Sequence, residues 1–436
     1  MDIIQQVLFI LTVGLTIYYG RKRILDIRRN ILLGRDVEIE PGSRGERWRN
    51  LLLLAFGQKK MFKRPIPAVL HLLIYAGFLI INLEVLEFVI DGILGEHRAF
   101  APYLGGAYHW AMNGFEFLAI GVLFSCLAFL FRRNVIRIKR FWSTEMTSWP
   151  RLDANIILIS EILLMLAILG MNASDQVLQS RLPDHYPRTG DLFFSSMIVS
   201  HFEQFETQSL VIIERSAWWF HILGILGFAI YITYSKHLHI FLAFPNTFYS
   251  SIHVKGQMNN MPVVTNEVKS MLGIAETPPQ EVGRFGAKDI NDLPWTSLLA
   301  AYACTECGRC TSECPANITG KKLSPRKIMM DTRDRMEDVG AKLTNGKSGF
   351  DDGKSLLGNY ISKEEINACT NCNACVEACP VSINPLEIIL ELRRYVAMEE
   401  SGCPPSWNSM FQNIETNFAP WKFSPTDRFN WAKEKA

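Results

Sequence analysis

The sequence predicts an all-α protein, in which a five-helix transmembrane bundle is followed by a helical domain in water. Two observations predict it. Nearly all long apolar runs lie before about residue 242, whereas eight of the ten cysteines lie between Cys304 and Cys379. The average composition of 48% hydrophobic residues hides this asymmetry. We therefore expect a membrane domain over 1–245, a linker over 246–294, a cysteine-rich domain over 295–400 and a C-terminal tail over 401–436.

Five apolar stretches have the length that a bilayer requires. A transmembrane helix needs about 20 mostly apolar residues, and the sequence supplies them at 3–19, 66–90, 108–131, 155–171 and 218–241. The first stretch does not read as a cleaved signal peptide, because its positive charges, Arg21 to Arg23, follow the apolar run instead of preceding it.

The charges of the loops predict the orientation of the five spans. Residues 20–65 carry thirteen Lys and Arg and residues 132–153 carry six, whereas 91–107 carry one and 172–217 carry three. Because loops rich in Lys and Arg stay in the cytoplasm, the N-terminus is expected outside and everything after the fifth span in the cytoplasm. The predicted location is the inner membrane of a bacterium or archaeon.

The strongest motif is a cysteine pattern that occurs twice. Cys304-x-x-Cys307-x-x-Cys310-x-x-x-Cys314-Pro315 recurs as Cys369-x-x-Cys372-x-x-Cys375-x-x-x-Cys379-Pro380. Zinc also favours paired Cys-x-x-Cys motifs, but it does not need a third cysteine at the same short spacing and a fourth before proline. The pattern therefore predicts two [4Fe–4S] clusters.

In such motifs the fourth cysteine ligates the other cluster. This predicts that one cluster is held by Cys304, Cys307, Cys310 and Cys379. The other is expected on Cys369, Cys372, Cys375 and Cys314.

Histidines at membrane depth form the second candidate site, because ionisable residues within spans are costly and are usually functional. By depth, His71 could meet His239 or His237 near the inner face, and His109 could meet His221 near the outer face. Because 18 residues return to the same face of a helix, His221 and His239 are expected to project from one stripe of the fifth span, about 27 Å apart along its axis. Paired imidazoles from facing helices are typical of b-type haem, so we expect two haems, with His71, His109, His221 and His239 as ligands.

Two carboxylates of the second span, Glu84 and Glu87, have two open interpretations. They could carry protons at a quinone site near the outer face, or they could be hydrogen-bonded to neighbouring helices.

The membrane half resembles the gamma subunit of respiratory nitrate reductase and heterodisulfide-reductase-type membrane subunits, in its five spans, its outward N-terminus and the 18-residue spacing of His221 and His239. In the nitrate reductase pattern the second span supplies two histidines, whereas here it supplies only His71. The cysteine domain resembles the α-helical dicluster ferredoxins of fumarate reductase, glycolate oxidase and heterodisulfide reductase, because Ser324-Pro325 and Asn384-Pro385 are typical helix starts.

These resemblances imply a membrane-bound electron-transfer subunit that connects a cytoplasmic redox partner with membrane quinone. The implied partners are a heterodisulfide-reductase-like subunit with cysteine-rich CCG domains, an electron-transfer flavoprotein or a hydroxy-acid dehydrogenase. The sequence has no nucleotide-binding glycine loop, flavin fingerprint or nucleophile arrangement, so we expect substrate catalysis on another subunit. A net charge of +2 gives no reason to expect nucleic acid. The alternative is a haem-free anchor that docks a ferredoxin module at the membrane.

Overall fold

The computed structural model of the chain describes residues 3–37, 39, 43–254, 256–274, 284–344 and 351–433. Across these residues the regular structure is helical, and β-structure is limited to two isolated bridges, Arg35 with Pro294 and Leu357 with Ile361. The predicted all-α fold is therefore confirmed.

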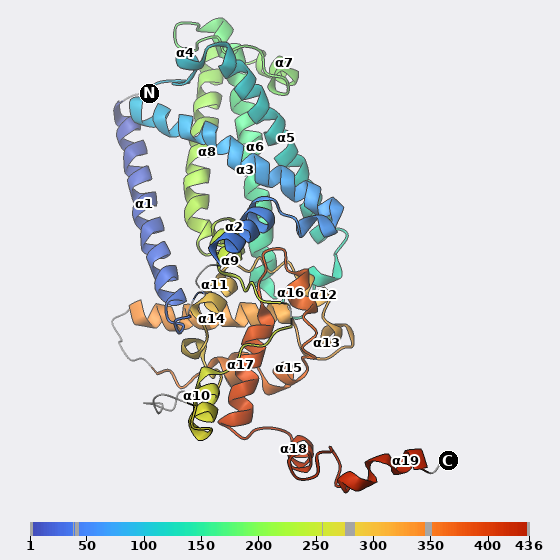
Figure 1. Cartoon of the computed structure of the whole chain (residues 1–436). Helices are drawn as coiled ribbons and strands as arrows, with labels where there is room; N and C mark the ends of the chain where they lie inside the picture. Colours follow the sequence, from blue (N-terminus) through green and yellow to red (C-terminus); the bar gives the residue numbers. More distant parts are fainter. Residues whose placement is uncertain are drawn as a thin grey trace.

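Five helices are long and apolar enough to cross a membrane, as predicted. They form the upper half of the molecule in Figure 1. Neighbouring helices pack as α3 on α5, α5 on α6 and α6 on α8, and α1 packs on α8 and α3. Their bounds are α1 Ile3–Ile31, α3 Pro65–Leu94, α5 Gly106–Asn134, α6 Ser148–Arg181 and α8 Thr207–Ile232.

The fifth span begins and ends earlier in the chain than the predicted range of 218–241. Helix α8 ends at Ile232, and the chain continues through a 3₁₀ turn, η5 Lys236–Leu238, into α9 His239–Tyr249. Asp153 stabilises the break, because its carboxylate accepts hydrogen bonds from the Tyr231 hydroxyl at 2.5 Å and from the Ser235 hydroxyl at 2.6 Å. His221 and His239 therefore do not share one continuous helix, and the expected common stripe was wrong.

Short helices make up the cysteine domain. Both predicted helix starts are confirmed, since α14 and α17 begin at Pro325 and Pro385. The Asn384 side chain caps α17 by accepting a hydrogen bond from the Glu387 amide at 3.3 Å. The elements of this domain are α11 Trp295–Tyr302, α12 Arg309–Ser312, α13 Pro315–Ile318, α14 Pro325–Thr344, α15 Lys363–Asn367, α16 Ala374–Ala378 and α17 Pro385–Met398.

The cysteine domain packs directly on one end of the bundle, and the two parts share a buried core. Ile27 and Ile31 of α1 belong to the same buried cluster as Leu298 and Leu392 of the cysteine domain. Side chains also pair across the junction, with Arg23 to Glu337 at 2.6 Å, Lys236 to Glu306 at 2.5 Å and Arg326 to Glu145 at 2.6 Å. Buried ion pairs are costly to break, so this junction holds the two parts in a fixed relation.

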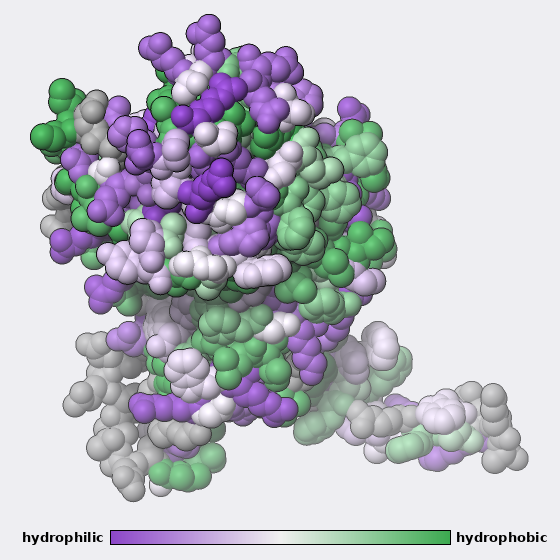
Figure 2. All heavy atoms as spheres, turned by 90° about the horizontal axis from the view of Figure 1, so that it is seen from above, coloured by the Kyte–Doolittle hydropathy of each residue, from purple (hydrophilic) through white to green (hydrophobic). Residues whose placement is uncertain are grey.

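Both ends of the molecule are plain in the figures. Helices α18 Pro405–Asn417 and α19 Asn430–Lys433 extend away from the body (Figure 1). Figure 2 views the opposite end, where loops join α3 to α5 and α6 to α8, and hydrophilic side chains cover much of that surface. The short helices α4 Ala101–Leu104 and α7 Val199–Phe202 lie in these loops.

Candidate functional site

The two cysteine motifs fold with the same backbone. In each motif the residues before and after the second cysteine have positive φ, namely Glu306 at 54° and Gly308 at 69° in the first motif. The second motif repeats this with Asn371 at 57° and Asn373 at 59°. Non-glycine residues in the left-handed region carry strain that clusters at functional sites. The repeated strain curls both loops in the same way around their thiols.

The eight thiols form two groups across the motifs. Helices α12 and α16, each inside one motif, pack against each other. Cys304 and Cys310 interact electrostatically with Cys307 of their own motif and with Cys379 of the other, and Cys310 also interacts with Cys375. Cys369 and Cys375 interact in the same way with Cys372 and with Cys314. This is the grouping that a crossed set of ligands requires.

Burial disfavours ionisation of these thiols, so they need a nearby cation in order to act as thiolate ligands. Burial raises the pKa of Cys304 and of Cys375 to about 12, and that of Cys379 to about 11. Ligation requires the thiolate, so the positive charge of iron would offset this cost. Amide groups assist, since Ile383 N–H donates to the Cys379 sulfur at 3.3 Å. Among the described residues no group of three or more His, Cys, Asp or Glu side chains is placed to hold a single metal ion.

A cavity of about 440 Å³ connects the membrane helices with the first group of thiols. It begins beside His221 of α8, passes His71 of α3 and His239 of α9, and reaches the loop of the first motif. The thiols of Cys304, Cys307, Cys310 and Cys379 form part of its wall. Towards the membrane the remaining lining is mainly apolar and comes from α3, α5, α6, α8 and α9, whereas several arginines line the end next to the cysteine domain.

Three of the cavity histidines have the ring orientation of a metal ligand. Nδ1 lies 3.1 Å from Gln58 Oε1 in His71, 3.0 Å from the Leu164 carbonyl in His221 and 3.2 Å from the Lys236 carbonyl in His239. A carbonyl oxygen only accepts hydrogen bonds, so Nδ1 carries the proton and Nε2 keeps its lone pair. Metal-binding histidines are usually oriented by such a bond from the second ring nitrogen.

The rings of His71 and His239 also stand at a suitable distance from each other. Their centroids are 6.4 Å apart. Two metal–imidazole bonds of about 2.0 Å each, plus the two ring radii, give a separation close to this. His237 also lines the cavity, but its ring lies edge-on to His239 at 5.4 Å and against Phe228 at 5.6 Å. The geometry therefore favours His239 over His237 as the partner of His71.

His109, the expected partner of His221, lies in a different environment. Its ring contacts Asn113 and stands against Gly190 of the loop between α6 and α8, and it is absent from the cavity lining among the described residues. His221 itself is buried beside Phe88, with 5.5 Å between the ring centroids. The pairing of His109 with His221 stays a prediction, with less geometric support than the pairing of His71 with His239.

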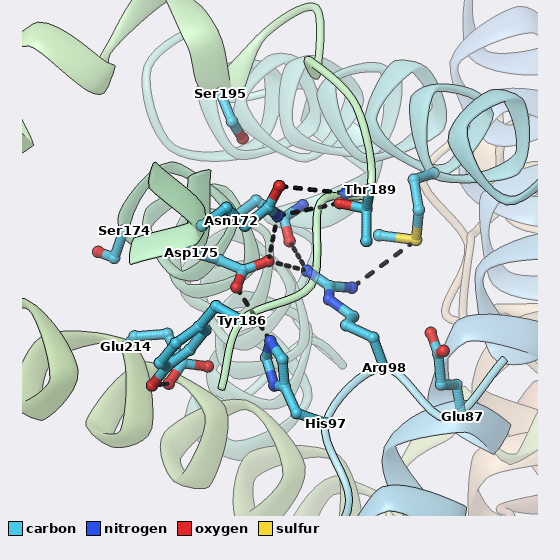
Figure 3. Close-up of polar contacts among 12 residues, drawn as sticks. Glu87, His97, Arg98, Asn172, Ser174, Asp175, Tyr186, Thr189, Ser195 and Glu214 are labelled. Atoms are coloured by element: carbon cyan, nitrogen blue, oxygen red, sulfur yellow. Dashed lines mark hydrogen bonds and ion pairs between the residues drawn. The ribbon is translucent and has the colours of Figure 1, made fainter. Parts of the chain in front are cut away.

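Glu87 and Arg98 lie in a buried polar network at the end of the bundle that is predicted to be the outer one (Figure 3), and Glu84 joins it through Arg98. Glu87 accepts hydrogen bonds from the Tyr108 hydroxyl at 2.8 Å and the Phe100 amide at 3.0 Å. Glu84 lies 3.7 Å from Arg98, which also binds Asn172 at 2.7 Å and Asp175 at 3.4 Å. Neither glutamate lines the cavity in the described part of the chain. For Glu87 the geometry favours the second interpretation, hydrogen bonding to neighbouring segments. Glu84 is held by the ion pair with Arg98, and its Oε1 accepts no hydrogen bond from the described residues.

Several residues of the site gave no clear signal in the sequence. Gln58 lies in a loop, is 5% exposed and has a φ of 48°. Lys236 and Glu306 are ordinary surface types in sequence, yet they form the buried ion pair beside the first motif. The one available signal was position, because Glu306 lies between Cys304 and Cys307.

Comparison with known proteins supports the iron–sulfur assignment. Residues 303–383 match the family described as 4Fe-4S dicluster domain. The chain is 27% identical to a probable iron-sulfur-binding oxidoreductase, FadF, of Bacillus subtilis, over 89% of this chain and 55% of the relative. It is 28% identical to the EtfAB:quinone oxidoreductase of Syntrophomonas wolfei, over 88% of this chain and 53% of that protein.

A third relative covers a smaller part of the chain. This probable membrane-anchored ferredoxin of Chromohalobacter salexigens is 30% identical over 34% of this chain and 24% of its own length. The chain spans about half the length of the two relatives that it matches almost throughout. No solved structure matches. Taken together, the chain carries a dicluster iron–sulfur domain, is similar to membrane-anchored and iron–sulfur electron-transfer proteins, and has an electron-transfer role itself.

Proposed function

We propose that the chain relays electrons between a cytoplasmic redox partner and membrane quinone, through two [4Fe–4S] clusters and b-type haem. One observation carries this proposal. A single cavity joins the histidines at the inner end of the bundle to the thiols of the first cysteine motif, so the groups held there would be neighbours.

The cluster ligands follow the two groups of thiols. Cys304, Cys307, Cys310 and Cys379 would hold the cluster nearer the membrane. Cys369, Cys372, Cys375 and Cys314 would hold the cluster nearer the partner. When bound, such clusters supply reversible one-electron transfer. The protein supports them by burying Cys304, Cys314 and Cys375 and by directing backbone amides at the sulfurs, as Ile383 does for Cys379.

The haem site uses the residues of the cavity. His71 and His239 would be the axial pair of an inner haem, with Gln58 and the Lys236 carbonyl fixing their tautomers. His221 would serve an outer haem, for which His109 is the remaining candidate. The apolar part of the lining and these hydrogen bonds would together tune the reduction potential of a haem bound there. We place the cluster domain in the cytoplasm because the lysine- and arginine-rich loops lie at the same end of the bundle as this domain. The N-terminus of α1 lies at the other end (Figure 1) and is therefore placed outside.

The name of the Syntrophomonas relative favours an electron-transfer flavoprotein as the partner. A relative in Methanosarcina mazei, 31% identical over 22% of this chain, is named as one component of a ferredoxin:CoB-CoM heterodisulfide reductase. A heterodisulfide-reductase-like protein is therefore a second candidate partner. A hydroxy-acid dehydrogenase is a third candidate, which rests on the sequence resemblance and not on the name of a relative described above.

Purified protein tests the proposal through its visible spectrum and metal content. We expect about eight iron atoms in clusters and a b-type α-band in the reduced-minus-oxidised spectrum. His71→Ala should remove the inner haem, whereas His201→Ala, a change of an exposed histidine in α7, should remove none. A menaquinone analogue should reoxidise the reduced protein. Full iron–sulfur content without any α-band would contradict the haem proposal and favour the haem-free anchor.

A further inference from the structure

The cavity contains one membrane-embedded carboxylate, Glu161 of α6. Glu161 lies one helical turn before Leu164, whose carbonyl orients His221. It is partly buried, and its side chain forms part of the wall between the level of His221 and the inner histidines. The electron-transfer chemistry proposed above does not use this residue.

Glu161 differs from the other carboxylates of the interior because it lacks a partner. The structure shows no hydrogen bond or ion pair to it from the described residues. Glu306, the other acidic residue of the cavity wall, is paired with Lys236 at 2.5 Å and with Arg333 at 2.6 Å. The carboxylates of the outer network accept hydrogen bonds or ion pairs from Arg98, Tyr108 and backbone amides.

The surroundings of Glu161 contain no fixed cation at its own level among the described residues. From the packed helices, Cys126 of α5 and His221 of α8 face the same part of the cavity, and Tyr75 and His71 approach from α3. The cations of the lining lie at the end next to the cysteine domain, namely Arg132, Arg133, Arg140, Lys236, Arg309 and Arg326. Lys236 lies beside Asp153. Asp153 precedes Glu161 by eight residues in α6, which is about 12 Å along the helix axis. A carboxylate in such a place is sensitive to any change of charge within the cavity.

We propose that Glu161 is a redox-linked proton-binding site, which takes up a proton when the cavity gains an electron and releases it when the electron leaves. The inference rests on the proposed function, which supplies the electron from the neighbouring cluster. For each electron that enters the inner haem, the Glu161 carboxylate binds one proton from water and becomes a neutral carboxylic acid. The added negative charge is thereby neutralised inside the low-dielectric interior, where an unpaired charge is costly.

A spectroelectrochemical titration of the haem α-band, repeated from acid to alkaline pH, tests this directly. In the unmodified protein the midpoint potential should fall as the pH rises, because reduction is coupled to proton uptake and the proton concentration is lower. Glu161→Gln should remove or strongly weaken that dependence. The midpoint potential of the haem in this variant should resemble that of the unmodified protein at low pH, because the glutamine amide is neutral like the protonated carboxylic acid. Glu161→Asp should retain the dependence.

Glu84→Gln is the matched control, since Glu84 is also a membrane-embedded carboxylate but lies outside the cavity wall. It should keep the pH dependence of the unmodified protein. An α-band whose potential does not depend on pH would overturn the inference and leave the proposed function intact. The same holds if Glu161→Gln binds haem and keeps the original dependence. Absence of any α-band would instead contradict the haem proposal.

Discussion

The two ends of the helical bundle use buried polar residues in opposite ways. At the outer end, Arg98 binds Asn172 and Asp175, and Glu87 and Asp91 accept hydrogen bonds from neighbouring side chains and amides. At the inner end, each of three histidines forms one hydrogen bond through Nδ1 and leaves Nε2 available beside a cavity. At membrane depth, polar side chains that are hydrogen-bonded or ion-paired to other helices therefore indicate helix packing. Polar side chains that leave a ligating atom such as Nε2 without a partner beside a cavity indicate a ligand site.

The largest effect should follow from a change in the cluster domain. Cys314→Ser is expected to remove the cluster of the second motif, because the structure groups Cys314 with Cys369 and Cys375. The iron content should fall from about eight to about four atoms, and the EPR signal of one cluster should disappear. Cys403→Ser, a cysteine outside both motifs, should change neither. If the lost signal instead belonged to the cluster bound by Cys304 and Cys307, the crossed assignment would be wrong.

A change at the outer end should affect stability without affecting cofactors. Arg98→Met removes the cation from a network that contains Glu84 and Asp175, which are both almost fully buried. Leaving buried carboxylates without their cation typically costs about 3–5 kcal/mol, so thermal unfolding should shift to a clearly lower temperature. Iron and haem content per folded molecule should stay the same. Loss of haem in folded Arg98→Met protein would show that the two ends are not independent.

A smaller effect is expected at Gln58, which orients His71. Gln58→Leu removes the acceptor of the His71 Nδ1 proton, and such changes typically weaken binding of the metal group by about 10- to 100-fold. The less basic imidazole should also raise the midpoint potential of the haem that remains. Gln58→Glu should lower that potential, since a carboxylate makes the ring more basic. Equal shifts in the same direction would indicate a purely structural role for Gln58.

The sequence predicted most of the fold because its signals are local. Apolar runs of membrane length, repeated cysteine spacing and the capping pairs at Ser324 and Asn384 each depend on neighbouring residues. The end of α8 at Ile232 was missed because it depends on Asp153, which is 78 residues from Tyr231 in the chain. Contacts of this kind are set by tertiary packing and leave no periodic pattern.

The candidate site was predicted in part for the same reason. His71 and His239 were recognisable as polar residues within apolar runs, and the structure brings their rings together. The roles of Glu84 and Glu87 could not be decided, because the distinction depends on Arg98 and Tyr108 from other segments. Gln58 was missed because a glutamine in a loop has no distinguishing sequence context.

The central claim is that the inner histidines and the first cluster share one cavity, and magnetic coupling between them tests it most directly. The EPR relaxation of the oxidised haem bound by His71 and His239 should be measured with the first cluster oxidised and then reduced. We predict faster relaxation when the cluster is reduced, and loss of this enhancement in Cys307→Ser. Unchanged relaxation in protein that contains both cofactors at full occupancy would contradict the claim.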